Sequence, residues 1–325
     1  MPSTHQRALL SGNRLHLSEG PIDLVIWADG APAAIAEAYR AAERRFNGLL
    51  AELVAELPLL RRPIPANAPR LHIVPSPLVG EGQGGGEPRR FWNPPTPNPS
   101  PQGGGEFATE FKSPIARRMA EACRPYRDTF ITPMAAVAGA VAQAVLAAMA
   151  QAAPLTRAYV NNGGDIALHL APGTSLAIGV VRSLEKAVPE GEVRITYDMP
   201  VRGIATSGRH GRSLSLGIAD AVTVLARDAP SADAAATIIA NAVNLDDAAI
   251  VRRPASDLDP DSDLGDIPVT VDVGPLTPDQ ITAALDAGVA RAEDLLHAGL
   301  IFAALLTLAG EWRSVGDPDT QPSPP

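Results

Sequence analysis

Three polar stretches in the middle of the chain combine residue types that bind charged ligands. They are AYVNNGGDIAL from Ala158, GIATSGRHGRS from Gly203 and ADAAATII from Ala232. Each stretch sets glycines or small hydroxyl residues beside a charge, and apolar sequence flanks each of them. A folded scaffold presents a ligand site on turns of this kind, so we expect residues 158–243 to carry the functional site.

The first stretch predicts a tight turn between two strands at Asn162, Gly163, Gly164 and Asp165. Glycine allows positive φ angles and a close approach of a ligand to the backbone, and Asp165 can accept a hydrogen bond from a ligand hydroxyl. An ordinary β-turn capped by the same aspartate explains these residues equally well. On this stretch alone, a ligand site and a structural turn both remain open.

The second stretch combines hydroxyl groups, a glycine-rich backbone and two guanidinium groups. Its candidate ligand-binding residues are Thr206, Ser207, Gly208, Arg209, His210 and Arg212. Phosphate oxygens are bound by backbone amides and by bidentate cations, so this composition suits a phosphate group. A polar hairpin loop has the same composition, and a lone histidine such as His210 is typical of a protein surface.

The third stretch places a carboxylate and a hydroxyl on one face of an expected helix, at Asp233 and Thr237. Residues four apart on a helix lie one above the other. Together the two side chains can hold a hard cation such as Mg²⁺, with a phosphate completing its shell. On this stretch alone, capping of the helix start by Asp233 explains these residues better.

Charge, cysteine content and the N-terminal sequence exclude several classes of protein. The 325 residues carry a net charge of −9 without a basic stripe, which argues against a nucleic-acid partner. The single cysteine, Cys123, cannot form an intrachain disulfide, and its helical spacing from Met119 predicts a buried side chain in a reducing compartment. The segment MPSTHQRALLSGNRLHL has no secretory-signal pattern, so we expect a cytoplasmic protein.

One apolar run, PMAAVAGAVAQAVLAAMAQAA from Pro133, has the length of a membrane span. It is mostly alanine, with Gln143 near its middle and no aromatic or basic anchors at its ends. We therefore expect a buried, closely packed helix and no membrane partner. The small residues also permit close packing between subunits, which leaves a homo-oligomer open.

Two further patterns give no support for a calcium, zinc or hydrolase site. The acidic run DLDPDSDLGD from Asp257 has no EF-hand register, because Ser262 stands at the glycine position and Pro268 at the glutamate position. A solvated acidic loop is expected there. The histidines show no HExxH spacing, and neither a GxSxG elbow nor a CxxC pair occurs.

The elements that must position these residues alternate between helical and strand patterns. Residues 14–28 predict two short strands, and the apolar spacing from Ile35 to Leu57 predicts one long helix that Pro58 ends. Further helices are expected from Ser113, from Pro133, from Ser231 as N-cap to Val243, and from Thr277 to His297. Further strands are expected between Ala158 and Tyr197, at Gly203, at Asp220 and at Val269. The order predicts an α+β fold, with a mixed or antiparallel sheet packed by long helices.

Changes of composition divide the chain. Residues 1–65 and 113–312 are expected to form one domain, interrupted by a disordered Pro/Gly-rich insert at 66–112 and followed by a disordered tail at 313–325. Within the insert, PSPLVGEGQGGGE and TPNPSPQGGGE look like the arms of a translated palindromic repeat of the kind that enters bacterial reading frames. GEGQGG there matches the G-x-G-x-x-G spacing, but prolines flank it where a dinucleotide site needs a strand and a helix.

Together the three polar stretches resemble the ApbE superfamily, the FAD:protein FMN transferases once called thiamine biosynthesis lipoproteins. VNNGGDI resembles the superfamily's VNAGGDI, GIATSG resembles AVATSG, and ADAAAT resembles AD-x-x-x-T. The similar region runs from Thr132 to Val243, and the chain is still more similar to an uncharacterised cytoplasmic branch of ApbE-related proteins. The resemblance implies an ApbE-like fold, FAD as a ligand, and Mg²⁺ bound by Asp233 and Thr237.

The chain departs from the superfamily pattern at two places. The superfamily helix carries a lysine-glycine pair and then an aspartate, whereas AAVAGAVAQAV has no lysine and offers Gln143 near the aspartate position. The superfamily's His-x-x-Asp-Pro-x-Thr-Gly segment is replaced by LSLGIADAV. Both departures fall at flavin-contacting or catalytic positions, so they favour ligand binding over transfer chemistry.

Three functions follow from these observations. The favoured one is a protein that binds a flavin nucleotide or a similar phosphate-bearing small molecule. The second is an active Mg²⁺-dependent transferase, in which a protein serine or threonine hydroxyl attacks the FMN-side phosphorus of FAD and releases AMP, assisted by Arg209 or Arg212. The third is a structural or interaction protein whose polar stretches are only turns; no catalytic residue is assigned.

Overall fold

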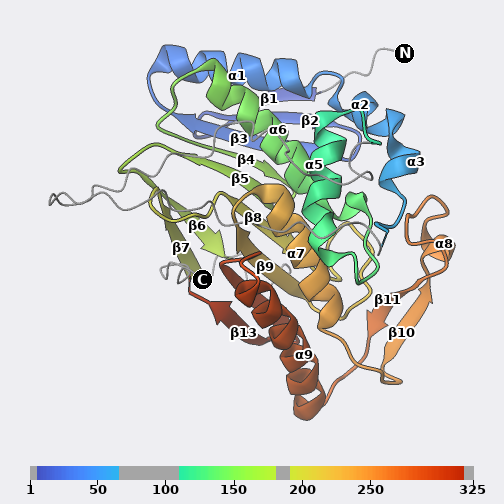
Figure 1. Cartoon of the computed structure of the whole chain (residues 1–325). Helices are drawn as coiled ribbons and strands as arrows, with labels where there is room; N and C mark the ends of the chain where they lie inside the picture. Colours follow the sequence, from blue (N-terminus) through green and yellow to red (C-terminus); the bar gives the residue numbers. More distant parts are fainter. Residues whose placement is uncertain (1–5, 66–109, 181–190, 318–325) are drawn as a thin grey trace, which may run out of the picture.

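A computed structural model of the chain describes residues 6–65, 110–180 and 191–317 (Figure 1). Its centre is a nine-stranded sheet in the order β1-β2-β3-β4-β5-β8-β9-β12-β13, and all neighbouring strands in it are antiparallel. The strands are β1 (Gln6–Leu10), β2 (Arg14–Glu19), β3 (Ile22–Asp29), β4 (Arg157–Asn162), β5 (Asp165–Leu170), β8 (Gly203–Ser207), β9 (Ala221–Ala226), β12 (Ala303–Leu308) and β13 (Glu311–Gly316). With the helices packed on it, this sheet confirms the predicted α+β fold.

Two short hairpins lie outside the main sheet. They are β6 (Ser175–Val180) with β7 (Gly191–Thr196), and β10 (Ile250–Pro254) with β11 (Pro268–Val273). Leu176 and Ile195 of the β6–β7 hairpin belong to a small apolar core with Leu225 of β9. This hairpin therefore covers part of one face of the main sheet, which we call the hairpin side.

Helices cover the opposite face, the helix side. The long ones are α1 (Pro32–Phe46), α5 (Pro114–Cys123), α6 (Val137–Ala152), α7 (Ala229–Ala242) and α9 (Pro278–His297). The short ones are α2 (Leu49–Ala55), α3 (Leu57–Leu60) and the 3-10 turns η1 (Arg124–Tyr126) and η2 (Pro133–Ala136). The short helix α8 (Ala255–Leu258) lies instead beside β10 of the second hairpin. Helices α1, α6, α7 and α9 follow one another, each in contact with the next, and α5 packs against α6 and α7 (Figure 1).

Neighbouring residues of one strand face different apolar cores. In β8, Ala205 belongs to the large core on the helix side, whereas Ile204 belongs to the small core on the hairpin side. The pairing carries this alternation across the sheet, because Ala205 lies opposite Val224 of β9 and Thr206 lies opposite Thr223. The register therefore tells which face each strand side chain occupies.

The alanine-rich run lies in the core as α6. Among the described residues, Pro133–Ala152 is one helical stretch with the length and apolar character of a membrane span. Half of the residues in its most apolar part are buried inside the protein. A Cβ at Gly139 would lie 2.4 Å from the carbonyl oxygen of Ala229, so only glycine allows this approach of α6 to α7. The prediction of a closely packed helix is confirmed.

The prediction of one long helix near the N-terminus is wrong. α1 ends at Phe46, and Gly48 has a φ of +79°, in the left-handed region, before α2 begins at Leu49. A second break at Glu56 precedes α3, whose first turn contains Pro58. Proline fits there because the first N–H groups of a helix have no helical partner, so Pro58 helps to start a helix and does not end one.

Gly48→Ala will lower the free energy of unfolding by about 1 kcal/mol, because an L-residue is strained in the left-handed region. A Cβ at this position meets no atom within 4 Å, so the cost is conformational and not steric. Urea denaturation measures the loss. Gly48→Asn is the matched control and should lose less, since asparagine adopts this conformation more readily; equal midpoints for all three proteins would contradict the expected strain.

Helix α7 begins two residues before its predicted start, at Ala229. Its N-cap is Asp228 and not Ser231: the Asp228 carboxylate accepts a hydrogen bond of 2.9 Å from the Ser231 backbone N–H. Pro230 in the first turn suits this arrangement, because a first-turn proline needs no hydrogen-bond partner. The predicted helix is confirmed, and its cap is corrected.

Two expected boundaries fall within ordered structure. β13 (Glu311–Gly316) includes the first residues of the expected tail, and Val315 in it is buried. Phe111, assigned to the expected insert, is also buried, so the packed chain resumes before Ser113. The rest of the insert, 66–109, and residues 318–325 of the tail lie outside the described residues.

Candidate functional site

The first polar stretch forms the predicted turn at one end of the main sheet. Asn162 of β4 pairs with Asp165 of β5, and the turn between them has φ angles of +66° at Gly163 and +117° at Gly164. Both angles favour glycine, which explains the two adjacent glycines. The turn is tied by a 2.8 Å hydrogen bond from the Gly164 N–H to the side chain of Asn161.

Asn162 is buried on the helix side and links three elements. Its side-chain oxygen accepts a hydrogen bond of 3.3 Å from the Asp23 N–H of β3, and its amide donates to the Ala138 carbonyl of α6 at 3.2 Å. A buried amide whose two ends are both bonded is held in one orientation. Asn162 therefore fixes the N-terminal end of α6 against the sheet.

Asp165 lies beside Asn162 and is also buried, with 9% of its surface exposed. Its carboxylate accepts a 3.3 Å hydrogen bond from the Thr206 N–H of β8. Burial raises the pKa of Asp165 well above its usual range, and the charge of Asp233 raises it further. The first and third polar stretches, which are far apart in the sequence, therefore meet in the structure.

Asp233 projects from α7 to the N-terminus of α6. Its carboxylate accepts a 2.9 Å hydrogen bond from the Gly139 N–H, an amide with no partner inside α6. Part of the residue is exposed, yet its carboxyl group is desolvated. Burial raises the pKa of Asp233 to about 7, opposed by hydrogen bonds from the Gly139 and Ala138 backbone. Asp233 thus caps a neighbouring helix, not the start of its own.

We call Asp165, Asp233 and Thr237 the carboxylate site. Thr237 follows Asp233 by one turn of α7, and all three donors are oxygen atoms. Among the residues that the structure describes, no group of three or more His, Cys, Asp or Glu side chains gathers around one point. Two carboxylates and a hydroxyl fit Mg²⁺, which keeps several waters and binds substrate phosphates, and a cation there would relieve the carboxylate repulsion.

Thr206 lies on the other face of the sheet. Its hydroxyl is 2.9 Å from the hydroxyl of Thr223, its cross-strand neighbour on the hairpin side. Of the predicted binding groups of Thr206, only the backbone N–H reaches the carboxylate site, through Asp165. Ser207, the next residue, lies on the helix side and is partly exposed.

The loop after β8 carries the predicted cationic residues, and two of them pair with a different carboxylate. Arg209 contacts Asp220 through its Nε at 2.9 Å and its Nη2 at 2.8 Å, and His210 lies 3.2 Å from the same carboxylate oxygen. Arg212 donates instead to the Pro21 carbonyl at 3.1 Å, beside β3. The structure therefore brings Asp165 and Asp233 together but pairs Arg209 and His210 with a residue that the sequence did not single out.

Gly208 joins this loop to β8 in a crowded place. Its φ is +153°, and a Cβ there would lie 2.5 Å from the Asp220 carbonyl oxygen. Glycine is required both for the conformation and for the space. Asp220 itself could have been noticed as an acidic residue at the start of the strand ADAVTVLA.

Two further residues were not predicted as site residues, one in α6 and one that contacts the segment before it. The side-chain oxygen of Gln143 accepts a 3.4 Å hydrogen bond from the Ala229 N–H, at the first residue of α7. Asp263, in the acidic run, hydrogen-bonds the buried Thr132 hydroxyl before η2. Burial raises the pKa of the Cys123 thiol, and the charges of Asp233 and Asp263 raise it further. The expectation of a wholly solvated acidic loop is wrong for Asp263.

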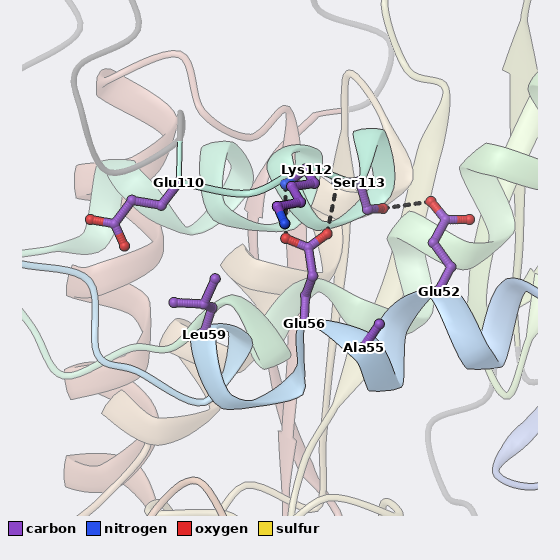
Figure 2. Close-up of a pocket in the computed structure, with 7 residues that line it drawn as sticks. All are labelled: Glu52, Ala55, Glu56, Leu59, Glu110, Lys112 and Ser113. Carbon is purple, nitrogen blue, oxygen red and sulfur yellow. Dashed lines mark hydrogen bonds between the residues drawn. The ribbon is translucent and has the colours of Figure 1, made fainter.

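A pocket of about 480 Å³ lies away from this site, between α2, α3 and the segment before α5 (Figure 2). Its lining residues are Glu52, Ala55, Glu56, Leu59, Glu110, Lys112 and Ser113. Glu56 accepts hydrogen bonds from the Lys112 and Ser113 N–H groups at 2.8 and 2.6 Å, and the Ser113 hydroxyl donates to Glu52 (Figure 2). These contacts join the chain on either side of the expected insert, which gives the pocket's carboxylates a structural role.

Comparison with known proteins relates the chain to two groups. The family model described as AbpE bacteria matches residues 6–75 and 101–314. A UPF0280 protein of Methanothrix thermoacetophila is 37% identical over 134 residues, which are 41% of this chain and 54% of the relative. A UPF0280 protein of Methanopyrus kandleri is 38% identical over 135 residues, 41% of this chain and 51% of the relative. The chain thus spans about half the length of these curated relatives.

One solved structure is similar over most of its length. It is the flavin transferase ApbE from Vibrio cholerae, which aligns over 96% of both chains with 12% sequence identity and a TM-score of 0.32. Between its two matched ranges the family model leaves residues 76–100 unmatched, and these fall inside the expected insert.

Proposed function

This chain belongs to the family described as AbpE bacteria, and from that membership we propose that its carboxylate site binds a flavin nucleotide or a ligand of similar phosphate-bearing chemistry. The observation that carries the proposal is the pair of desolvated carboxylates, Asp165 and Asp233, beside the glycine turn at 163–164. The flavin part rests on the resemblance of the three polar stretches to the ApbE superfamily. The phosphate part follows from the donors that surround the site.

A phosphate group needs a cation to bind here. The Gly139 N–H at the N-terminus of α6, which could otherwise bind an anion, already donates to Asp233. Two carboxylates without a counter-charge repel a phosphate. We therefore infer that Asp233 and Thr237 hold Mg²⁺, which supplies the positive charge that neutralises the phosphate oxygens.

The chain's own groups then orient the ligand. Asp233 is fixed by the Gly139 N–H and Asp165 by the Thr206 N–H, so neither carboxylate has to be ordered when the ligand arrives. Asp165 is suited to accept a hydrogen bond from a ligand hydroxyl. The turn at Gly163 and Gly164 lets a ligand approach the backbone, since a Cβ at either glycine meets no atom within 4 Å.

Transfer of FMN from FAD to a protein is the second candidate function. Asp233 and Thr237 would hold the cation equally in a binding protein and in a transferase. Near the position where the superfamily carries an aspartate, however, the side-chain oxygen of Gln143 accepts a hydrogen bond from the Ala229 N–H and so holds α6 against α7. That structural use of Gln143 favours binding without transfer.

A fluorescence titration of FAD with and without Mg²⁺ tests the proposal. We expect saturable binding that Mg²⁺ strengthens, and we expect Asp233→Ala to weaken it by about tenfold or more, since a buried carboxylate that holds the cation is lost. Asp294→Ala is the matched control, because this α9 carboxylate is exposed and makes only a 4.0 Å contact with Arg291. It should bind FAD as the wild-type protein does.

Three outcomes separate the candidate functions. Binding without AMP release supports the proposal, whereas Mg²⁺-dependent AMP release from FAD in the presence of a serine- or threonine-containing acceptor protein replaces it with the transferase. Absence of saturable binding under either condition overturns the proposal and leaves a structural or interaction protein.

A further inference from the structure

We propose that Asp220 is a positioning residue for phosphate binding: it fixes the loop after β8 and orients the guanidinium group of Arg209 toward a ligand phosphate. The inference rests on the proposed function and names a residue that acts through another one. Its basis is the set of contacts that one carboxylate makes to two separate chain segments, the loop after β8 and the β12–β13 turn.

Both oxygens of Asp220 accept hydrogen bonds. Oδ1 accepts a hydrogen bond of 2.9 Å from Nε of Arg209 and forms an ion pair of 2.8 Å with Nη2 of the same residue. The His210 ring nitrogen lies 3.2 Å from the same oxygen. Oδ2 receives the backbone N–H of Ala309, in the β12–β13 turn, at 2.6 Å. The Asp220 N–H donates to the Thr307 carbonyl at 2.9 Å. The carboxylate therefore ties the loop after β8 to β9 and to the β12–β13 turn.

The loop backbone is fixed at the same place. The Arg209 N–H donates to the Ala219 carbonyl at 2.9 Å, and Gly208 lies so close to the Asp220 carbonyl that no side chain fits there. With its main chain and one side-chain edge both bonded, Arg209 has few conformations left. Little ordering entropy remains to be lost when a ligand binds.

The planar geometry of the Arg209 guanidinium group determines which N–H donors remain for a ligand. Arginine has five N–H donors in a rigid planar fork, and Asp220 takes the edge formed by Nε and Nη2. The donors on Nη1 point in another direction from the same plane. About a quarter of the Arg209 side chain is exposed, at 24%, so a phosphate can reach it.

Strain at Ala309 supports a role beyond packing. Ala309 has a φ of +51°, one of two positive φ angles at non-glycine residues in the described chain, and its N–H is the one that Asp220 accepts. Backbone strain of this kind persists only where surrounding contacts hold it, and it concentrates at functional sites. The carboxylate thus holds a strained turn and an arginine at once.

The test compares ligands with and without phosphate on Asp220→Asn. With Mg²⁺ present, we expect the affinities for FAD and for inorganic pyrophosphate to fall about fivefold to tenfold, because the arginine is no longer held in place. Riboflavin, which has no phosphate, should bind within about twofold of wild type. In the Arg209→Ala background, Asp220→Asn should cause no further loss, since both changes act on one interaction.

A second variant covers the case in which Asp220→Asn does not fold. Ala309→Gly removes the strain from the β12–β13 turn, because glycine adopts positive φ freely, so Asp220→Asn with Ala309→Gly keeps the turn while the carboxylate is absent. Unchanged pyrophosphate affinity in a folded Asp220→Asn protein, or an equal loss for riboflavin, overturns the inference alone. A wild-type protein that binds neither FAD nor pyrophosphate overturns the proposed function, and the inference with it.

Discussion

Alanine at position 203 will lower the free energy of unfolding by about 3 kcal/mol, because β8 and α7 are in backbone contact there. Its Cβ would lie 2.0 Å from the carbonyl carbon of Asp228 and 2.3 Å from the nitrogen of Ala229. Both are backbone atoms, so no side chain can rotate away, and relief requires α7 to move off the sheet. Alanine has less conformational entropy than glycine in the unfolded chain, and this offsets only about 0.5–1 kcal/mol of the loss in stability.

The same displacement will weaken FAD binding, because Asp233 lies on α7 and must reach Gly139 of α6. Urea denaturation of Gly203→Ala measures the stability loss. Gly274→Ala is the control: its nearest neighbour, the Ala249 oxygen, would be 3.3 Å from the new Cβ, so a shift of a few tenths of an ångström is enough and the loss should not exceed about 1 kcal/mol. A wild-type midpoint for Gly203→Ala would contradict the close approach of β8 and α7.

The metal-free protein will lose stability as the pH rises from about 4 to about 7, and Asp233→Asn will remove much of that loss. Burial raises the pKa of Asp233 from its ordinary 3.8 to about 7. Between pH values of about 4 and 7 the folded protein binds more protons than the unfolded chain. The stabilisation that comes from protonated Asp233 is therefore complete below the unfolded-state pKa and is lost as the pH rises through the folded-state pKa. Its upper bound is about 4 kcal/mol, at about 1.4 kcal/mol for each tenfold change in proton affinity.

Urea unfolding at pH 5 and pH 8 in EDTA measures this dependence. The difference between wild type and Asp233→Asn isolates the carboxyl pair, because other titrating groups such as His169 contribute to both proteins. Asp294→Asn, at an exposed carboxylate, should follow the wild-type curve. Mg²⁺ at pH 8 should stabilise the wild-type protein and not Asp233→Asn. Parallel pH curves for wild type and Asp233→Asn would rule out a buried titration at this residue.

Local signals were sufficient to predict several elements. The glycine pair at 163–164 marked the β4–β5 turn, and the helix expected from Thr277 to His297 is α9, which begins with a capping box of Thr277 and Gln280. β13 could not be predicted, because its polar residues have no strand alternation of their own and become a strand by pairing with β12. The break at Gly48 was hidden for a different reason: α1 and α2 both pack on one core, so the apolar spacing continues through it.

The site was predictable in its residue types and not in its arrangement. Three short motifs were enough to infer the relation to ApbE proteins, which the family match confirms. They also named Asp165 and Asp233, but strand alternation turns the Thr206 hydroxyl to the opposite face of the sheet. The pairing of Arg209 with Asp220 depends on the folded path of the intervening loop, which neither spacing nor composition encodes.

The framework is tied together on both sides of the segment between Pro65 and Glu110. On one side the Ile64 N–H donates to the Ile131 carbonyl at 2.9 Å, and on the other the Lys112 N–H donates to Glu56 at 2.8 Å. For a chain that joins two fixed anchors, each doubling of length costs only about 0.6 kcal/mol. An inserted sequence of this kind therefore costs the protein little folding free energy. A reporter domain inserted at the same position should leave the rest of the fold intact.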